Sequence, residues 1–281
     1  MPAAPTPLSS PEPAWTDPLL ANPHAALDKA QRVQRMFAAI APSYDLNNRL
    51  HSLGLDQYWR NVAVKMADVK PADTIVDVAC GTGDLTIKLA HRLWRVHAGT
   101  NRSPSPGQVL GIDFTSEMLP IARHKAARQW ASIRGDSHLT LLDDTVRFIN
   151  GDALALPLPE RSADILSIAF GIRNVADWGR AIDEFARVLK PGGRLIILEF
   201  SLPKNPLLRG LYNFYFRRIL PRTATWISGD KTGAYKYLPE SVNTFISRQA
   251  MQERMTAAGF AAIEARPLTF GICVCYKGVR T

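Results

Sequence analysis

Residues 74–88 read TIVDVACGTGDLTIK, and this stretch decides the fold of the chain. Its first five residues are an apolar run with the composition of a buried parallel strand. A glycine turn follows at residues 79–84, and a helix-forming run begins at Leu85. A strand, a glycine turn and a helix together present backbone N–H groups and a helix N-terminus to a ligand. Gly81 and Gly83 have no Cβ, so the backbone there can bend tightly and approach a ligand closely.

The spacing of the glycines separates two classes of turn. A dinucleotide-binding turn has the pattern G-x-G-x-x-G, but the position of its third glycine is Thr86 in this chain. The turn instead fits acidic-x-Ala-x-Gly-x-Gly, beginning at Asp77. Asp77 lies near the carboxyl end of the strand, and open α/β sheets bind ligands at that edge. A purely structural turn between strand and helix is the plain alternative.

This pattern resembles the first motif of class I S-adenosylmethionine-dependent methyltransferases. That motif usually has glycine where Ala79 stands, and we expect the turn to tolerate alanine with slightly less room for the methionine end of the cofactor. Asp113 ends the next strand, 109–113, where a carboxylate can accept hydrogen bonds from two ribose hydroxyls. Asp113 lies 30 residues after Gly83, beyond the dinucleotide spacing of about 20. A polar surface loop at 94–107 accounts for the excess.

Composition bounds the functional classes. The chain has 281 residues, of which 46% are hydrophobic and 21% are charged, and this fits one soluble globular domain with extensions. The net charge of +9 favours nucleic acid or an anionic membrane as partner, or else a solvated basic surface. The three cysteines lack zinc spacing and give no disulfide framework, so no metal site is expected and a reducing cytoplasm fits. No run of 18 apolar residues is present.

The first 26 residues are Pro-rich and lack both a signal-peptide core and the arginines of a transit peptide, so we expect a disordered tail. Residues 27–70 have helical periodicity, broken at Pro42, and are expected to cover the ligand pocket. Tyr44 and Asp45 follow that break, where a polar pair can contact a substrate.

Strands and helices alternate along the rest of the chain. Strands are predicted at 146–150, 164–170, 194–200, 262–268 and 271–277, and helices at 116–133, 178–189 and 247–258, with an irregular segment at 135–144. This alternation predicts an α/β fold with a doubly wound parallel sheet. Asp152 and the N–H of Ala153 follow one strand, where a carboxylate and a donor can bind the edge of adenine. Cys273 and Cys275 share one strand face, which favours core packing.

A basic, aromatic-rich helix is predicted at 206–220, followed by a polar loop at 229–237. The helix can rest on a membrane, cap an apolar pocket, or be an ordinary surface helix. Arg209, Asn213 and Arg217 lie opposite its apolar arc, whereas Arg218 lies inside it. The arc contains Leu207, Leu208, Leu211, Tyr212, Phe214, Tyr215 and Ile219.

Seven short runs together resemble the ubiquinone/menaquinone biosynthesis C-methyltransferase family. The glycine turn and a Lys-Pro-Gly-Gly turn indicate only class I methyltransferases, whereas the Tyr-Asp pair, the FGIRN run and the YLPES run are more specific. The runs are SYD (43–45), SLG (52–54), DVACGTGDL (77–85), FGIRNV (170–175), RVLKPGG (187–193), LEFS (198–201) and YLPES (237–241).

The resemblance implies a Rossmann-like class I methyltransferase domain at 27–281. Its sheet would have seven mostly parallel strands with a reversed last strand, helices on both faces and an N-terminal helical cover at 27–70. Residues 205–240 would form an insert that faces the substrate or a membrane. The Pro-rich tail and the two loop insertions depart from the compact pattern of the family.

The resemblance also implies site residues. Arg173, Asn174 and Tyr44 are the candidate catalytic residues: Arg173 would stabilise an enolate or acidify a water that Asn174 orients, and Tyr44 would hydrogen-bond the ring oxygen. A structural ion pair is the alternative for Arg173. The family often has Ser where Ala169 stands, so that side-chain contact is absent here. The residues expected to hold S-adenosylmethionine are Asp77, Gly81, Thr82, Gly83, Asp113, Asp152, Ala153 and Ala169.

The implied reaction is C-methylation of a polyprenylated benzoquinol or naphthoquinol, as in demethylmenaquinone methyltransferase. The implied partners are the polyprenyl quinol, a peripheral contact at the inner face of the membrane and a second copy in a homodimer, with no nucleic acid. Two other classes stay open: a methyltransferase for RNA, DNA or another small molecule, which the charge favours, and a non-catalytic accessory protein of a quinone assembly.

Overall fold

The computed structural model of the chain describes residues 14–99, 107–134 and 145–281. Its strands form one seven-stranded sheet in the order β3-β2-β1-β4-β5-β7-β6. Strands β1 to β5 pair in parallel, whereas β7 runs antiparallel to both of its neighbours. The structure therefore confirms a mostly parallel sheet with a reversed last strand. The strands are β1 (Thr74–Val78), β2 (Gln108–Asp113), β3 (Val146–Asn150), β4 (Ala163–Ala169), β5 (Leu189–Phe200), β6 (Phe260–Leu268) and β7 (Cys273–Arg280).

Helices pack on both faces of the sheet because successive strand residues point to opposite sides. Ile75 of β1 packs into a core beneath α4 (Leu55–Ala67), α5 (Asp84–Ala98) and α6 (Met118–Arg134). Val76, the next residue, packs into a second core beneath α8 (Trp178–Val188) and α12 (Arg248–Ala257). Within the described ranges, none of the helices has the length and apolar content that a membrane span requires.

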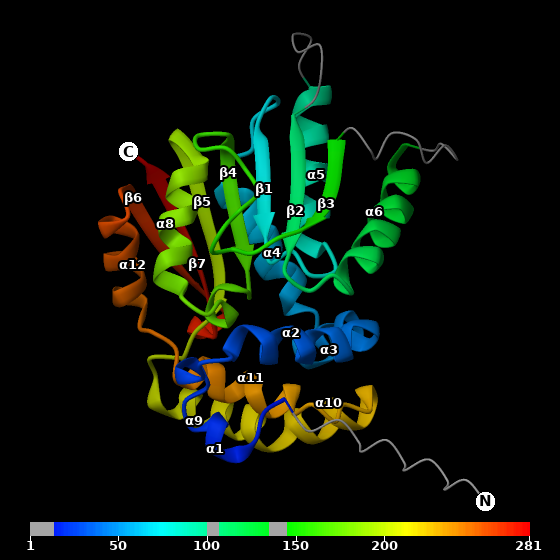
Figure 1. Ribbon diagram of the computed structural model, residues 1–281, viewed down its shortest axis with the longest axis vertical. Helices are drawn as coiled ribbons and strands as arrows, with labels where there is room; N and C mark the ends of the chain where they lie inside the picture. The colour runs from blue at the N-terminus through cyan, green and yellow to red at the C-terminus, as the bar shows by residue number, and fades with distance from the viewer. Residues whose placement is uncertain (1–13, 100–106, 135–144) are drawn as a thin grey trace, which may run out of the picture.

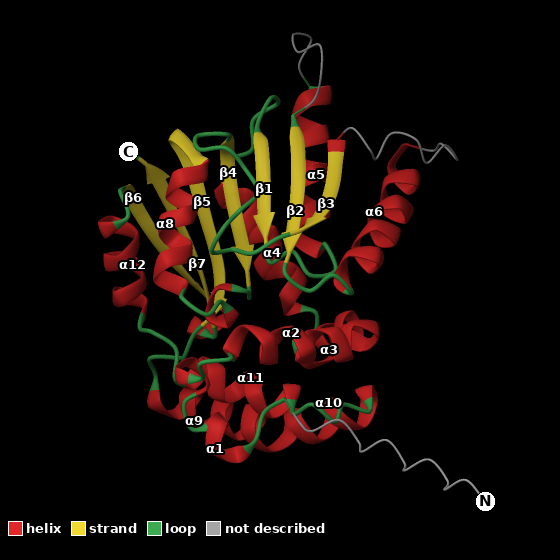
Figure 2. Cartoon of the chain, viewed as in Figure 1, coloured by secondary structure: helices red, strands yellow, loops and turns green. Residues whose placement is uncertain are grey.

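A separate helical layer lies across the carboxyl ends of the parallel strands (Figures 1 and 2). It has its own apolar core, which includes Met36, Phe216 and Tyr237. The layer contains α1 (Asp17–Leu20), α2 (Lys29–Ile40), α3 (Tyr44–His51), α9 (Pro206–Phe214), a π-helix (Tyr215–Ile219), α10 (Leu220–Ser228) and α11 (Ala234–Asn243). Short 3₁₀ turns lie at Pro23–Ala25, Ala41–Ser43, Ile172–Asn174 and Thr269–Gly271.

Most predicted elements are present with small shifts of boundary. β1 and β3 have the predicted bounds, and the Ser247 side chain caps α12 by accepting the N–H of Ala250 at 3.1 Å. The surface loop predicted to begin at residue 94 is wrong for its first part, because α5 continues to Ala98. The remainder of that loop, 100–106, and the irregular segment predicted at 135–144 lie outside the described residues.

The tail expected to be disordered through residue 26 is ordered from Ala14. Trp15 is 2% exposed and stacks on the Tyr237 ring of α11 at a centroid distance of 4.4 Å. The backbone N–H of Trp15 donates to the Thr232 carbonyl, and Arg32 donates to the Ala14 carbonyl at 2.8 Å. Proline-rich composition indicated disorder, but one buried indole and two backbone contacts hold this segment against the helical layer.

The loop predicted at 229–237 is wrong in its second half, where α11 begins at Ala234. The Asp230 carboxylate accepts the N–H groups of Thr232 and Ala234, and Gly233 adopts a φ of 84° just before the helix. The predicted helix at 206–220 continues into α10 through the π-helix.

The apolar arc of the 206–220 segment is divided between two sides. Tyr212, Phe216 and Leu220 point into the core of the layer, and the wider turn of the π-helix keeps these three residues in line. Leu211 and Phe214 are 60% and 62% exposed. One side of this helical segment is therefore an apolar surface open to the surroundings.

All three cysteines are buried and free. Cys273 and Cys275 lie in the same core, as their alternation on one strand face predicts. Burial raises the pKa of each thiol, that of Cys275 to about 12. The thiols are therefore protonated at neutral pH.

Truncating Trp15 tests whether the N-terminal segment belongs to the folded layer. The substitution Trp15→Ala should lower the free energy of unfolding by about 3 kcal/mol, since it removes a buried indole. Trp226→Ala is the matched control, because Trp226 is 86% exposed and its loss should change stability by less than about 0.5 kcal/mol. Urea unfolding followed by circular dichroism measures both, and equal stabilities of the two variants would contradict the assignment.

Candidate active site

The turn after β1 brings the backbone to the carboxyl edge of the sheet in a left-handed conformation. Ala79, Gly81 and Gly83 have φ values of 51°, 55° and 82°. Ala79 thus occupies a conformation that glycine adopts without cost and alanine adopts at a cost of about 1 kcal/mol. A Cβ on Gly171 would lie 2.6 Å from the Ala79 Cβ, so only glycine fits opposite this turn.

Asp113 ties the end of β2 to the glycine turn. Its carboxylate accepts the N–H of Gly81 at 2.7 Å and the N–H of Thr115 at 2.8 Å. Burial raises the pKa of this carboxyl, and the two backbone donors oppose that rise. Asp113 is only 7% exposed, so its carboxylate is held in place at the strand edge where a ribose is expected.

A cavity of about 110 Å³, here called the strand-edge cavity, collects most of the predicted cofactor residues. The polar groups fit the nucleoside part of S-adenosylmethionine: one carboxylate accepts from the ribose hydroxyls, a second carboxylate with a neighbouring N–H binds adenine, and a glycine leaves the turn open. The predicted residues that line it are Gly81, Asp113, Asp152, Ala153, Ala169, Asn174 and Tyr44.

A narrower cleft, here called the glycine-turn cleft, adjoins the strand-edge cavity through Tyr44, Ala79, Gly81 and Ala169. Asp77 lines this cleft, but its carboxylate accepts hydrogen bonds from Thr86 and Ser167 at 2.6 and 2.7 Å. Burial raises the pKa of Asp77 to about 6, although both hydroxyls oppose the rise.

Thr82 and Gly83 lie differently from the other predicted cofactor residues. Thr82 lines the glycine-turn cleft, and its hydroxyl donates to Asp45 of α3 at 2.6 Å. Gly83 lines neither the strand-edge cavity nor the glycine-turn cleft, and a Cβ at this position would lie 3.1 Å from the Phe148 ring. Gly83 therefore serves the packing of α5 against the sheet.

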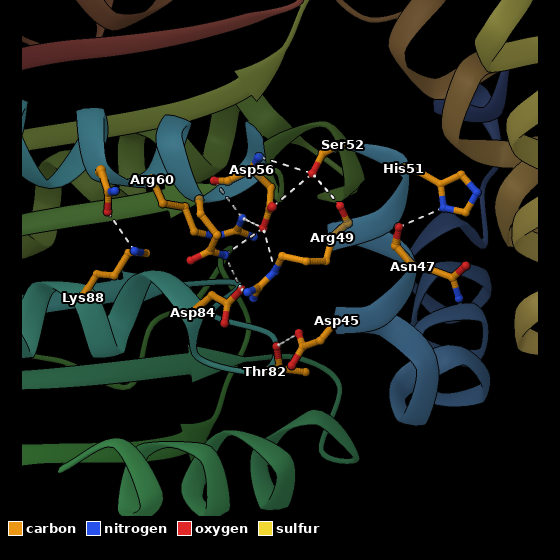
Figure 3. Close-up of polar contacts among 12 residues, drawn as sticks. Asp45, Asn47, Arg49, His51, Ser52, Asp56, Arg60, Thr82, Asp84 and Lys88 are labelled. Carbon is orange, nitrogen blue, oxygen red and sulfur yellow. Dashed lines mark hydrogen bonds and ion pairs between the residues drawn. The ribbon is translucent and has the colours of Figure 1, made fainter. Parts of the chain in front are cut away.

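A polar network fastens the helical cover to the glycine turn (Figure 3). Lys125 of α6 contacts Asp45 at 2.7 Å and Asp84 at 2.6 Å, and it donates to the Thr82 hydroxyl at 2.9 Å. Arg49 of α3 reaches the same Asp84 carboxylate at 3.4 Å. Asp45, expected to contact a substrate, instead connects α3 to the turn.

An apolar cavity of about 390 Å³ lies between the sheet edge and the helical layer. Its walls come from α2, α3, α4, the π-helix and α11, and its apolar lining includes Met36, Phe37, Trp59, Phe200, Phe216 and Ile272. Leu53, 87% exposed, also lines it, so the cavity reaches the surface beside the link between α3 and α4. Tyr44 lines this cavity, the strand-edge cavity and the glycine-turn cleft.

Arg173 lines the apolar cavity and forms a buried ion pair. Its Nη1 donates to the Glu199 carboxylate at 2.6 Å and to the Phe170 carbonyl at 2.7 Å. Its Nε donates to the Ser241 hydroxyl at 3.3 Å. The structural ion pair considered from the sequence is therefore present, and the same guanidinium borders the space for an apolar ligand.

Asn174 lies on the other side of the same turn, in the strand-edge cavity. Its amide nitrogen donates to the Phe170 carbonyl at 3.2 Å, and its amide oxygen accepts the Tyr237 hydroxyl at 3.0 Å. Both ends of the amide thus have protein partners, which hold the side chain between α11 and β4.

A buried lysine secures this turn from the cover. Lys29 of α2 is 2% exposed, and its ammonium donates to the carbonyls of Arg173 and Val175 at 2.9 and 2.7 Å. Burial, followed by the charge of Arg173, lowers the pKa of Lys29 to about 8. The ammonium also donates to Nδ1 of His24, whose Nε2 donates to the Ser241 carbonyl.

Sequence reasoning missed Lys29, Lys125 and Arg60, the last of which lines the glycine-turn cleft from α4. Lys29 had a detectable signal, because it shares the apolar face of α2 with Val33, Met36 and Ile40. Lys125 gave no such signal, because its partners Asp45, Thr82 and Asp84 lie in α3, the glycine turn and α5, all distant from it in sequence. The predicted site residues Arg173, Asn174 and Tyr44 do lie around one junction, although they border different cavities.

The His24 contact predicts a pH dependence of stability. Burial, together with the charges of Lys29 and Arg173, lowers the pKa of His24 from 6.5 to about 4, although the hydrogen bond to the Ser241 carbonyl opposes this. The unfolded chain therefore binds the extra proton first, and stability falls as pH drops from about 6.5 to about 4. Thermal unfolding of the His24→Asn variant should show a shallower decline over this range.

His124→Asn is the control, because His124 is exposed on α6. It should keep the slope of the unchanged protein. Identical slopes for the His24→Asn variant and the unchanged protein would show that His24 does not carry the effect.

Comparison with known proteins agrees with this geometry. The model of the ubiE/COQ5 methyltransferase family matches residues 26–280. Demethylmenaquinone methyltransferase of Deinococcus radiodurans is 42% identical over 89% of this chain and 93% of its own, and that of Thermus thermophilus is 44% identical over 87% and 100%. The ubiquinone/menaquinone biosynthesis C-methyltransferase UbiE of Geotalea daltonii is 39% identical over 89% and 97%.

Solved structures share the fold at low sequence identity. A SAM-dependent methyltransferase of Thermotoga maritima, described as a possible histamine N-methyltransferase, superposes with a TM-score of 0.56 at 18% identity over 89% of this chain and 100% of its own. Magnesium protoporphyrin IX methyltransferase of Synechocystis, solved with bound SAH, gives 0.50 at 17% identity over 82% and 84%. The sheet is thus that of a Rossmann-like methyltransferase, and from the family match and these relatives, the chain belongs to the ubiE/COQ5 methyltransferase family.

Proposed function

We propose that this protein transfers a methyl group from S-adenosylmethionine to a ring carbon of a polyprenylated quinol in respiratory quinone biosynthesis. The observation that carries the proposal is the position of Tyr44, which borders the strand-edge cavity with its carboxylates Asp113 and Asp152, the glycine-turn cleft and the apolar cavity. A methyl donor with a nucleoside and an acceptor with an isoprenoid tail need such a junction between a site with fixed carboxylates and an apolar site. The names of the relatives support the same substrate class.

Once bound, the sulfonium of the cofactor supplies an electrophilic methyl group. The protein then has to align a ring carbon with it and favour loss of a proton from a ring hydroxyl. Alignment of two bound reactants can supply on the order of 7–11 kcal/mol. The charge of Arg173 at the wall of the apolar cavity favours the phenolate form of the quinol, and Tyr44 holds a ring oxygen by a hydrogen bond.

The Tyr44 hydroxyl is suited to donate rather than to act as a base. Burial raises the pKa of this phenol, so it keeps its proton at neutral pH. Phe37 packs its ring edge against Tyr44 with a centroid distance of 5.9 Å and fixes the side chain. The phenol and the Arg173 guanidinium therefore stabilise a ring phenolate from two sides, while a water accepts the proton.

We propose further that the 205–240 insert contacts the membrane in which the quinol resides. Exposed arginines accompany exposed apolar side chains on α9, the π-helix and α10, and this combination fits an anionic lipid surface. Together they form the outer surface of the insert. It consists of Leu207, Leu211, Phe214, Ile219 and Trp226 with Arg209, Arg217, Arg218 and Arg222.

A methyltransferase for RNA is the main rival, because the net charge of +9 suits a polyanion. The exposed arginines of the insert alternate with large apolar side chains, which suits lipid. The lining of the 390 Å³ cavity is mainly aromatic and aliphatic, and its arginines Arg60 and Arg173 each pair with a buried carboxylate, so the cavity suits an isoprenoid tail better than a phosphate backbone.

The decisive experiment supplies purified protein with methyl-labelled S-adenosylmethionine and one of three acceptors: demethylmenaquinol, the corresponding demethylated benzoquinol, or bulk transfer RNA. Label should enter an extractable quinone whose mass rises by one methyl group, and the two quinols report which ring is preferred. Label in RNA, or in no acceptor although S-adenosylhomocysteine binds, would overturn the proposal. In cells that lack the protein, extracted quinone should be lighter by one methyl.

Removing the Tyr44 hydroxyl should separate catalysis from cofactor binding. We expect Tyr44→Phe to lower kcat for the quinol about tenfold, because one hydrogen bond to the reacting ring is lost. Affinity for S-adenosylhomocysteine should change by less than about twofold. Tyr212→Phe is the matched control in the same cavity wall and should keep the rate. A Tyr44→Phe rate equal to that of the control excludes the proposed hydrogen bond.

Vesicle sedimentation tests the membrane surface. The protein should sediment with vesicles that contain about one-third anionic phospholipid and should be released by high salt. The double substitution Leu211→Asp and Phe214→Asp should reduce binding at least about tenfold. Tyr58→Ser, an exposed change on α4, is the control and should bind normally. Full binding by the double variant would assign membrane contact to another surface.

A further inference from the structure

We infer that Arg60 binds the carboxylate of the methionine portion of S-adenosylmethionine in the glycine-turn cleft. The inference rests on the proposed function, since it concerns the same cofactor, and it assigns a residue that the sequence motifs did not indicate. Three observations carry it: where the guanidinium lies, which of its donors are used, and which charges surround it.

Arg60 projects from α4 toward the glycine turn (Figure 3) and is 6% exposed. It lines both the glycine-turn cleft and the apolar cavity. Its guanidinium carbon lies 5.2 Å from the centre of the Phe170 ring, which holds the planar group in place. The side chain is therefore fixed at the boundary between the two sites.

The protein uses few of the donors of this guanidinium. Nη1 donates to the Asp56 carboxylate at 2.8 Å and to the Asp56 carbonyl at 3.2 Å. Nε and Nη2 make no hydrogen bond with the residues that the structure describes. Neither nitrogen is among the fully enclosed side-chain atoms that lack a partner, so both remain accessible to a ligand. A guanidinium offers five N–H donors in all. A carboxylate can use two such donors at once.

The charge of Arg60 extends to the turn that would hold the cofactor. Burial alone would raise the pKa of Asp84, yet the nearby Arg60 and Lys125 keep this pKa below its usual value. Arg60 also opposes the rise that burial causes in the pKa of Asp77. The guanidinium is therefore an electrostatic partner of groups on both sides of the cleft.

The composition of the cleft points to the cofactor carboxylate as the ligand. Its lining includes the acidic residues Asp77 and Asp84, whereas Arg60 is the one lysine or arginine among the described residues that line it. An amino acid moiety placed between the glycine turn and α4 needs a cation for its carboxylate, and Arg60 meets that need. Arg173, the other buried guanidinium near the junction, lines the apolar cavity and not this cleft.

Calorimetry with two ligands tests the contact directly. S-adenosylhomocysteine carries the carboxylate, and its decarboxylated analogue S-adenosyl-3-thiopropylamine lacks it. The unchanged protein should bind S-adenosylhomocysteine at least about tenfold more tightly than the analogue, as a charge-assisted pair requires. The Arg60→Gln variant should lose this preference while binding the analogue within about threefold of the unchanged protein.

Two further variants keep the result interpretable. Arg49→Gln is the matched control, because Arg49 belongs to the same polar network but does not line the cleft; it should retain the preference. The double variant Asp56→Asn and Arg60→Gln removes both members of the buried pair, so no unpaired carboxylate remains if the single variant unfolds. The double variant should also lose the preference for S-adenosylhomocysteine over the decarboxylated analogue. Thermal unfolding checks that each variant is folded.

The outcomes separate the two hypotheses. If the unchanged protein binds S-adenosylhomocysteine and a folded Arg60 variant weakens both ligands equally, Arg60 is structural and the inference fails while the proposed function stands. If the preference persists in the variant but the KM for quinol rises, Arg60 serves the acceptor, and the inference fails as well. If the unchanged protein binds neither ligand, the proposed function itself fails.

Discussion

The buried ion pair between Arg173 and Glu199 is the interaction on which the arrangement of the site depends. The Glu199 carboxylate lies at 2% exposure on β5 and accepts hydrogen bonds from the Arg173 side chain and from the Phe200 N–H. The backbone carbonyl of Arg173 accepts a hydrogen bond from the Lys29 ammonium, and the Arg173 side chain donates to the Ser241 hydroxyl. One pair therefore joins the sheet to α2 and α11. Removing either charge would leave the other buried and unpaired, at a cost of about 3–5 kcal/mol.

The same pair limits how Arg173 can act in catalysis. An arginine already bonded to a carboxylate is a poor proton acceptor, and a guanidinium does not give up its proton in proteins. What it offers the acceptor is a fixed positive charge at the wall of an apolar cavity. Fixed charges of this kind need no reorganisation when a phenolate develops, which is the property that favours reaction in a dry site.

The fold could largely be predicted because its information is local. The 74–78 strand, the glycine turn and the Ser247 cap each depend on residues adjacent in sequence, and the structure has them where expected. The segment at 14–26 and the start of α11 could not be predicted, because their order comes from Trp15 and from the Asp230 carboxylate that caps the turn. Long-range packing overruled a composition that is typical of loops.

The candidate site likewise contains residues that could be predicted from the sequence and residues that could not. Asp113 and Asp152 follow strands directly, so the rule that ligands bind at the carboxyl edge was enough to nominate them. The Asp45 and Thr82 contact could not be foreseen, since it joins α3 to the glycine turn across 37 positions. Arg60 was equally hidden, because a helix periodicity alone does not say that one of its cations faces a cleft.

The burial of the three thiols has a consequence for an enzyme that handles quinones. A quinol awaiting methylation is easily oxidised, and the resulting quinone has an unsubstituted ring position that thiolates attack by conjugate addition. Cys80 is next to the donor turn, yet it is 9% exposed and burial raises its pKa well above the usual value. Cys273 and Cys275 are fully enclosed. The three thiols are thus held in their protonated, weakly nucleophilic form, which protects them from alkylation by the acceptor.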